Sequence, residues 1–294
     1  MICGSTMSEL LDFTVYNLLK EFDPKNEGFM PRARFYKAIY LLHSRLKKRK
    51  INICLPWCWY KFGPEVQERY ISKDVFRISA MGPDADERYR LYYGKEPRTK
   101  SILEKERQAI LNEIKKLNKE HWSTDKLIDE VYKKAPYKML KTFKDLEDYL
   151  KKELRPRNGL SPKGIETIIA YLNDIHQNYK KEEFLEMFDE YLRMDDLVRI
   201  TLEHLHERLN DLIPLIIRFR EIIATKASIL FNENLPDDWV SERETLLNER
   251  ISAFRPDLDL FEKETFKEYS KCVPGDNRYS KMLLEVSYDM SKEA

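Results

Sequence analysis

The sequence predicts a mainly α-helical protein with one small β-hairpin in its N-terminal half and a bundle of long helices in its C-terminal half. Only eight of the 294 residues are glycine and 35% are charged, which is typical of helical proteins. Apolar residues recur at spacings of three and four over long stretches, as in amphipathic helices. Two alternating segments joined by Gly82-Pro83-Asp84 predict the hairpin.

The distribution of charge predicts two modules, 1–155 and 156–294. The net charge is +1, but residues 1–155 hold 33 Lys and Arg against 23 Asp and Glu, and residues 156–294 hold 19 against 28. The polar segment Arg155-Pro156-Arg157-Asn158-Gly159 lies where the balance reverses and is a predicted linker. The asymmetry has three interpretations: solubility alone, a nucleic-acid or acidic-protein partner for the N-terminal module, or charge complementarity within or between chains.

The N-terminal module is predicted to contain five helices. The first spans residues 8–22. The second starts near Pro31, which suits a first helical turn, and carries the apolar stripe of Phe35, Ile39, Leu42 and Leu46. Helices at 101–120, from 124 to the break at Pro136, and at 138–154 complete the module.

The hairpin is predicted from residues 75–79 and 88–93. Its outer face carries Arg77, Arg88 and Arg90. A hairpin attached to a small helical core has the outline of a winged helix, so these arginines are candidate phosphate contacts. Basic side chains on a two-stranded edge also prevent aggregation between edges, and this alternative stays open.

The C-terminal module is predicted to be a bundle of long amphipathic helices or a dimerisation arm, through which the chain would form a homo-oligomer. Helical segments are expected at 162–179, 181–194, 195–231 and 240–254. Pro214 should kink the third of these. The periodicity weakens after Phe266, which predicts a poorly ordered tail.

The segment following the second helix is the most distinctive part of the chain. It begins with four consecutive cations, Lys47, Lys48, Arg49 and Lys50, which are candidate nucleic-acid contacts. An aromatic turn follows, and Pro56 argues against a regular central strand there. Its rings either fill a seam in the core or anchor a partner protein. The candidate partner-binding residues are Trp57, Trp59, Tyr60, Lys61, Phe62, Gly63 and Pro64.

This stretch resembles the Panacea antitoxin domain of prokaryotic toxin-antitoxin and phage-defence loci. The resemblance rests on a K-x-x-Y-L-x-H helix and a Trp-to-Gly-Pro turn, with a second similar segment at Val131–Tyr137. It covers about residues 8–150, and the acidic-aromatic continuation after the Gly-Pro of that family is only approximated here. The matching positions are Lys37, Tyr40, Leu41, His43, Trp59, Lys61, Gly63 and Pro64. The resemblance implies a protein that neutralises a toxin encoded beside it.

No motif predicts catalysis, so we expect neither an enzyme nor a cofactor. The chain lacks a phosphate-binding G-x-x-x-x-G-K-[ST] loop, a G-x-S-x-G nucleophile motif and an H-E-x-x-H zinc motif. The four cysteines have no zinc-ligand pattern, and we expect no metal site and free thiols. The acidic residues at 182–196 are interpreted as a solvated face, since a carboxylate magnesium site would need several elements to converge.

The leading hypothesis is therefore a non-enzymatic interaction protein, antitoxin-like or associated with phage defence, that binds and neutralises a partner. The alternative is a nucleic-acid-binding regulator that uses the basic run and the hairpin arginines. Without a signal peptide or an apolar run that could span a bilayer, we expect a cytoplasmic location and no membrane partner.

Overall fold

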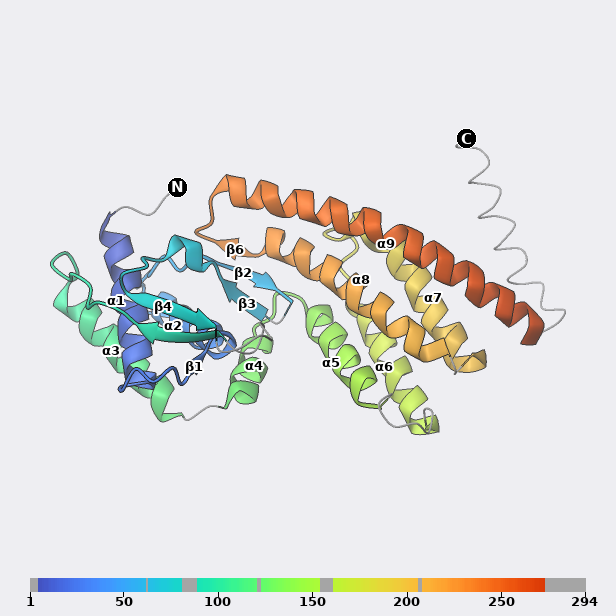
Figure 1. The fold of residues 1–294 in the computed structure, drawn as a ribbon, viewed down its shortest axis with the longest axis horizontal. Helices are drawn as coiled ribbons and strands as arrows, with labels where there is room; N and C mark the ends of the chain where they lie inside the picture. The colour runs from blue at the N-terminus through green and yellow to red at the C-terminus, as the bar shows by residue number, and fades with distance from the viewer. Residues whose placement is uncertain are drawn as a thin grey trace. The chain divides into compact units, whose positions relative to one another are not determined.

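The computed structural model describes residues 5–61, 63–80, 89–120, 123–153, 161–205 and 208–272, and it is mainly α-helical, with small antiparallel sheets and long C-terminal helices (Figure 1). The chain forms two compact units. Unit 1 comprises Met1–Pro136 and Ala224–Thr245, and unit 2 comprises Tyr137–Ile223 and Leu246–Ala294. These units do not follow the predicted division at 155/156, because a late segment completes unit 1. The predicted linker, Arg155 to Gly159, lies outside the described residues.

The helices of unit 1 form where their apolar periodicity predicts them. They are α1 (Ser5–Phe22), α2 (Arg32–Lys48), α3 (Glu104–Lys119) and α4 (Thr124–Tyr132), with a short 3-10 turn, η1 (Glu68–Tyr70). Pro31 precedes α2 in an extended conformation, and Ser123 caps α4 by accepting a hydrogen bond from the Lys126 N–H. The stripe of α2 is the centre of the unit, since Phe35, Ile39 and Leu42 are fully buried.

The predicted hairpin is confirmed and belongs to a three-stranded sheet. Strands β4 (Phe76–Ala80) and β5 (Tyr89–Tyr93) pair antiparallel, with Ile78 opposite Leu91. The loop between them lies outside the described residues. The two-residue strand β1 (Met30–Pro31) adds to the other edge of β5 and gives the order β1-β5-β4.

A second three-stranded sheet holds the aromatic turn, where we expected no regular strand. Strand β2 (Trp57–Tyr60) starts directly after Pro56 and pairs antiparallel with β3 (Gly63–Val66) on one side and β6 (Asn232–Glu233) on the other. Pro56 therefore precedes the strand, a position where proline leaves the ladder intact. Strand β6 comes from the late segment of unit 1, so pairing across more than 170 residues in sequence creates this sheet.

Unit 2 contains α5 (Lys138–Glu153), α6 (Pro162–Asn178), the 3-10 turn η2 (Leu185–Met187) and α7 (Phe188–His204). It also contains parts of α8 (Leu209–Leu230) and α9 (Asp237–Cys272), both of which continue into unit 1. Stacked and tilted rings join these helices, since Phe219 lies 5.8 Å from Phe143, 6.2 Å from Tyr191 and 5.7 Å from Phe254, measured between centroids.

Two predicted boundaries in this half need correction. The expected helices at 181–194 and 195–231 are replaced by α7 and α8, with a break after His204, and Pro214 lies inside α8. Helix α9 continues to Cys272, through the residues predicted to lack periodic order, because Phe266 and Tyr269 pack with Ile200 and Leu205.

Candidate functional site

The residues that carry the resemblance meet in unit 1. Lys37, in the middle of α2, is only 4% exposed, and its Nζ donates a hydrogen bond to the Pro64 carbonyl at 3.1 Å. Burial lowers the pKa of Lys37 to about 8, while Glu65 and Cys58 act in the opposite direction. The lysine thus fastens α2 to the β2–β3 hairpin, and its ammonium is not offered to a ligand.

The two tryptophans of the aromatic turn are buried. Trp57 is 8% exposed and Trp59 is 1% exposed. The Tyr40 ring contacts Trp57 edge-on at 4.6 Å, and Trp59 packs edge-on against Tyr132 of α4 at 5.7 Å. Strand β2 lies between β3 and β6 and is covered on both faces, since Cys58 is also buried. The rings therefore fill the core, and the interpretation of Trp57 and Trp59 as exposed anchors is wrong for this conformation.

The tip of the turn is more accessible. Tyr60 and Lys61 are partly exposed, and Phe62 lies outside the described residues. Gly63 has φ +92°, a conformation that favours glycine, and a Cβ there would lie 3.1 Å from Val131 Cγ1. The Tyr132 hydroxyl donates to the Lys61 carbonyl at 3.3 Å. The second similar segment, Val131–Tyr137, thus begins directly against the turn.

The basic run divides into paired and unpaired cations, all four of them exposed. Lys47 lies 2.8 Å from Glu233, and Arg49 lies 2.6 Å from Glu113. Among the described residues, Lys48 and Lys50 have no carboxylate within ion-pair distance. The run is therefore only half available to an external anion.

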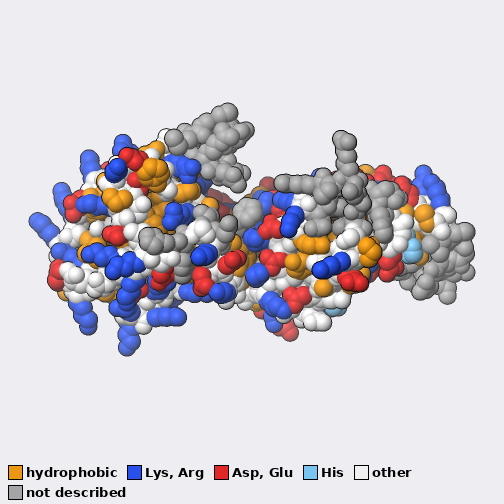
Figure 2. All heavy atoms as spheres, turned by 90° about the horizontal axis from the view of Figure 1, so that it is seen from below, with side chains coloured by type: hydrophobic (Ala, Val, Ile, Leu, Met, Phe, Trp, Pro, Cys, Tyr) orange, Lys and Arg blue, Asp and Glu red, His pale blue; other side chains and the backbone are white. Residues whose placement is uncertain are grey.

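A further cation, Lys134, follows the C-terminal end of α4 and lies near Lys48. The Nζ of Lys134 lies 3.1 Å from the Ser44 hydroxyl. Burial lowers the pKa of Lys134, and the like charges of Lys48 and Arg45 lower it further. Arg45 itself pairs with Glu120 at 2.8 Å. We call Lys48, Lys50 and Lys134 the basic face. More generally, many Lys and Arg side chains cover the surface of unit 1 (Figure 2).

Glu233 links α2 to strand β6. It accepts hydrogen bonds from Lys47 and, at 3.2 Å, faces the Nε2 of His43, whose side chain is buried. Its pKa falls to about 2 because of the bond to His43 and then that to Lys47, against the opposing effect of burial. His43 and Glu233 thus join α2 to β6.

Two of the three hairpin arginines, Arg77 and Arg90, lie within the described residues. Arg77 is exposed and lies opposite Tyr92, whereas Arg90 is partly exposed and lies opposite Ser79. Both sit on the predicted outer face, and Arg88 lies outside the described residues. Their contact with phosphate stays a prediction.

The acidic segment of unit 2 is not uniformly solvated. Glu190 and Asp195 are each 6% exposed, and they pair with Arg255 at 2.5 Å and with Arg199 at 2.8 Å. The described residues contain no group of three or more His, Cys, Asp or Glu that could hold a metal ion. The thiols of Cys58 and Cys272 are free, but Cys54 is disulfide-bonded, so the expectation of free thiols is wrong there.

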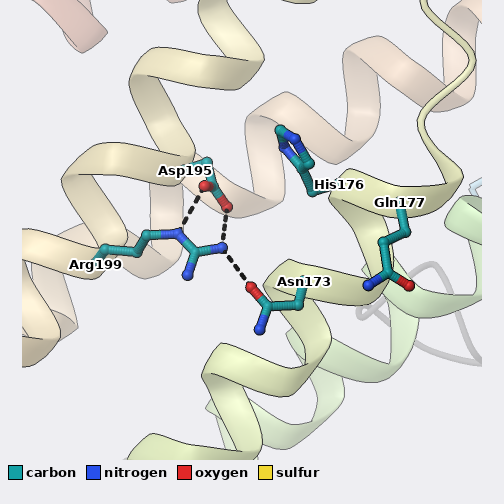
Figure 3. Close-up of a pocket in the computed structure, with 5 residues that line it drawn as sticks. All are labelled: Asn173, His176, Gln177, Asp195 and Arg199. Atoms are coloured by element: carbon teal, nitrogen blue, oxygen red, sulfur yellow. Dashed lines mark hydrogen bonds and ion pairs between the residues drawn. The ribbon is translucent and has the colours of Figure 1, made fainter.

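Sequence reasoning missed a pocket in unit 2, where α6 and α7 face each other (Figure 3). Its lining combines amides, an imidazole and an ion pair. The lining residues are Asn173, His176, Gln177, Asp195 and Arg199. Their spacings, three and four residues apart on α6 and four apart on α7, place each set on one helix face, which is the only signal the sequence held.

Comparisons with family models, with curated proteins and with solved structures found no match to this chain. Among the described residues, no helix is both long and apolar enough to cross a membrane.

Proposed function

We propose that this chain is a non-enzymatic protein-interaction module of the antitoxin type, which binds and neutralises a partner protein. The observation that carries the proposal is the convergence of the motif residues. Lys37, Tyr40, Trp59, Gly63 and Pro64 lie in one packed cluster, against which the second segment rests through Val131 and Tyr132. Because separate parts of the motif build one local structure, the resemblance has more support than the short sequence pattern alone provides.

The partner surface that we propose surrounds this cluster. Helix α4 packs on the turn through Tyr132, and Lys134 follows two residues later, beside Ser44 of α2. We propose that the tip of the turn, at Tyr60 and Lys61, and the basic face belong to one partner surface of unit 1. Gathering Lys48, Arg45 and Lys134 costs electrostatic energy, which an acidic surface on the partner would offset.

This proposal is tested by co-expression with the protein encoded by the neighbouring gene. We expect a complex that survives purification and relief of the growth defect that the neighbour causes when expressed alone. If the two proteins neither copurify nor change growth, the antitoxin proposal fails.

The unpaired cations also favour a second candidate function, a nucleic-acid-binding regulator. Lys48, Lys50 and Lys134, together with the hairpin arginines, would contact phosphates. Binding of this kind weakens steeply as salt rises, because each contact releases about one counterion. Absence of any mobility shift of DNA or RNA at low salt excludes this candidate.

We also propose, from the same reasoning on long helices, that unit 2 contributes to self-association. Leu260 on α9 is 58% exposed and is the position at which we test for an apolar contact between two copies. Light scattering after size-exclusion chromatography tests this, since Leu260→Glu should convert a dimer into a monomer.

A further inference from the structure

The pocket between α6 and α7 has the features of a small-molecule site. It has a volume of about 300 Å³, is open to solvent and lies wholly within unit 2. In Figure 3 the Asp195–Arg199 pair forms one side, His176 and Gln177 form the other, and Asn173 completes the lining. Ligand pockets in proteins start at roughly this size.

One wall of the pocket is fixed before any ligand arrives. The Nε of Arg199 donates to Asp195 Oδ2 at 2.8 Å, and its Nη2 donates to Asn173 Oδ1 at 2.9 Å, which ties α7 to α6. Asp195 is buried, so the guanidinium has few alternative positions. The carboxylate and the guanidinium cancel in formal charge, and the wall presents directed hydrogen-bonding groups without a net charge.

Several of these groups have no partner among the described residues. They are Arg199 Nη1, Asn173 Nδ2, both ends of the Gln177 amide, and the ring nitrogens of His176. The set contains donors and acceptors, because each side-chain amide carries both kinds of group. A matching ligand therefore presents donors and acceptors side by side on a rigid edge.

His176 joins the pocket to a buried aromatic cluster, whose Tyr191 does not line the pocket. The Tyr191 ring lies 6.1 Å from the His176 ring and stacks on Tyr179 at 4.4 Å. The Tyr191 hydroxyl, one helical turn before Asp195, is buried without a hydrogen-bond partner. Asp196 follows Asp195 and carries a further carboxylate, which opposes phosphate and other anions.

We infer that this pocket binds an uncharged planar heterocycle of the nucleobase kind, with the edge of the base on Asn173, Gln177 and Arg199 and its face beside His176. Asparagine and glutamine amides recognise base edges by paired hydrogen bonds, and imidazole rings stack on bases. This inference does not depend on the proposed partner protein.

The test is calorimetric titration of the full chain with the four ribonucleosides, which are uncharged. We expect at least one to bind saturably, and Gln177→Ala to weaken it roughly tenfold through loss of the amide contacts. Gln108→Ala removes an exposed amide from α3 in unit 1 and is the matched control, expected to leave the affinity unchanged. Gln177 is exposed, so its variant should keep the wild-type melting temperature.

Parallel titrations separate the sources of a base. The monophosphate of the bound nucleoside should bind more weakly than the nucleoside, because of Asp196. A short single-stranded oligonucleotide that binds when free nucleosides do not would show that phosphates carry the binding and would overturn the inference. No binding of any of these ligands, or equal affinities of Gln177→Ala and wild type, would overturn it.

Discussion

The two halves of helix α2 differ in what their side chains do. In the first half, Lys37 and Tyr40 point into the packed cluster beneath the β2–β3 hairpin, where a charged group and two indole rings are enclosed. In the second half, Lys48 is exposed and repels Lys134, which follows the end of α4, through its like charge. The motif residues therefore specify a local structure, and we propose that partner recognition depends on the exposed residues around it. Substitutions of the buried Lys37 and Tyr40 should change stability, and substitutions of the exposed Lys48 should change binding.

The largest expected effect is at the centre of the cluster. Trp59→Ala removes a ring that is 1% exposed and packs against Tyr40 and Tyr132. We expect it to lower the free energy of unfolding by about 3–5 kcal/mol, measured by urea denaturation. Phe29→Ala is the control, since Phe29 is 64% exposed and should change stability by less than about 0.5 kcal/mol. If Trp59→Ala were as stable as the Phe29→Ala control, Trp59 would be a surface residue and not part of the core.

The second effect is a pH dependence of stability caused by Lys37. Its pKa is about 8 in the folded chain, below the ordinary 10.5, so between these values the unfolded chain binds the proton more strongly. Stability should therefore rise with pH across this window, by up to about 3 kcal/mol for this group. The raised pKa values of Cys58 and Tyr40, both about 12, act in the opposite sense at high pH.

The contribution of Lys37 is isolated by subtraction. The stability difference between wild type and Lys37→Met, measured by denaturation at several pH values from 8 to 10.5, should change in favour of wild type as pH rises. Lys48→Met, at an exposed position of the same helix, should follow the wild-type curve. Parallel curves for wild type and Lys37→Met would mean that the lysine is solvated.

A smaller effect is expected at the turn. Gly63→Ala places a side chain at φ +92° and 3.1 Å from Val131 Cγ1. The backbone strain alone costs about 1–3 kcal/mol. The double variant Gly63→Ala with Val131→Ala relieves the crowding but leaves the strain, so thermal unfolding should still show a melting temperature below that of Val131→Ala alone. Equal melting temperatures of these two variants would remove the argument for a required glycine.

The smallest stability effect is at Glu233 of β6, which pairs with His43 and Lys47 of α2. Its pKa of about 2 lies below the ordinary 4.5, so its contribution is complete above pH 4.5 and is lost as pH falls toward 2. Because the side chain is 34% exposed, we expect only about 1 kcal/mol after solvent screening. Acid denaturation of Glu233→Gln should accordingly show a shallower loss than wild type over this range, and an identical loss would contradict the assignment.

The sequence was a good guide to local structure and a poor guide to long-range contacts. The starts of α2 and α6, at Pro31 and Ser161, and the pairing of β4 with β5 follow from capping, periodicity and alternation. Strand β6 could not be predicted, because two residues pair with β2 only after the chain has passed through unit 2. This pairing makes β2 the central strand of its sheet, and Tyr40 of α2 and Tyr132 of α4 pack on Trp57 and Trp59 in the core.

The pairing of charged side chains also depends on long-range contacts that the sequence does not predict. Which of the cations in Lys47–Lys50 are paired depends on Glu113 and Glu233, which lie 64 and 186 residues away from their partners. The burial of Asp195 likewise depends on Arg199 and on the packing of α6 against α7. The sequence shows which charged side chains each surface can carry, and tertiary contacts decide which of these side chains remain unpaired.

We propose that the basic face binds the partner directly, and that the aromatic cluster holds the local structure beneath the basic face. The most direct test is copurification of the neighbouring gene product with the double variant Lys48→Glu and Lys134→Glu, beside the matched double variant Lys105→Glu and Lys115→Glu on the exposed side of α3. We predict that the first variant keeps the wild-type melting temperature but loses the partner, while the second retains it. Retention of the partner by a folded Lys48→Glu and Lys134→Glu variant would contradict the account.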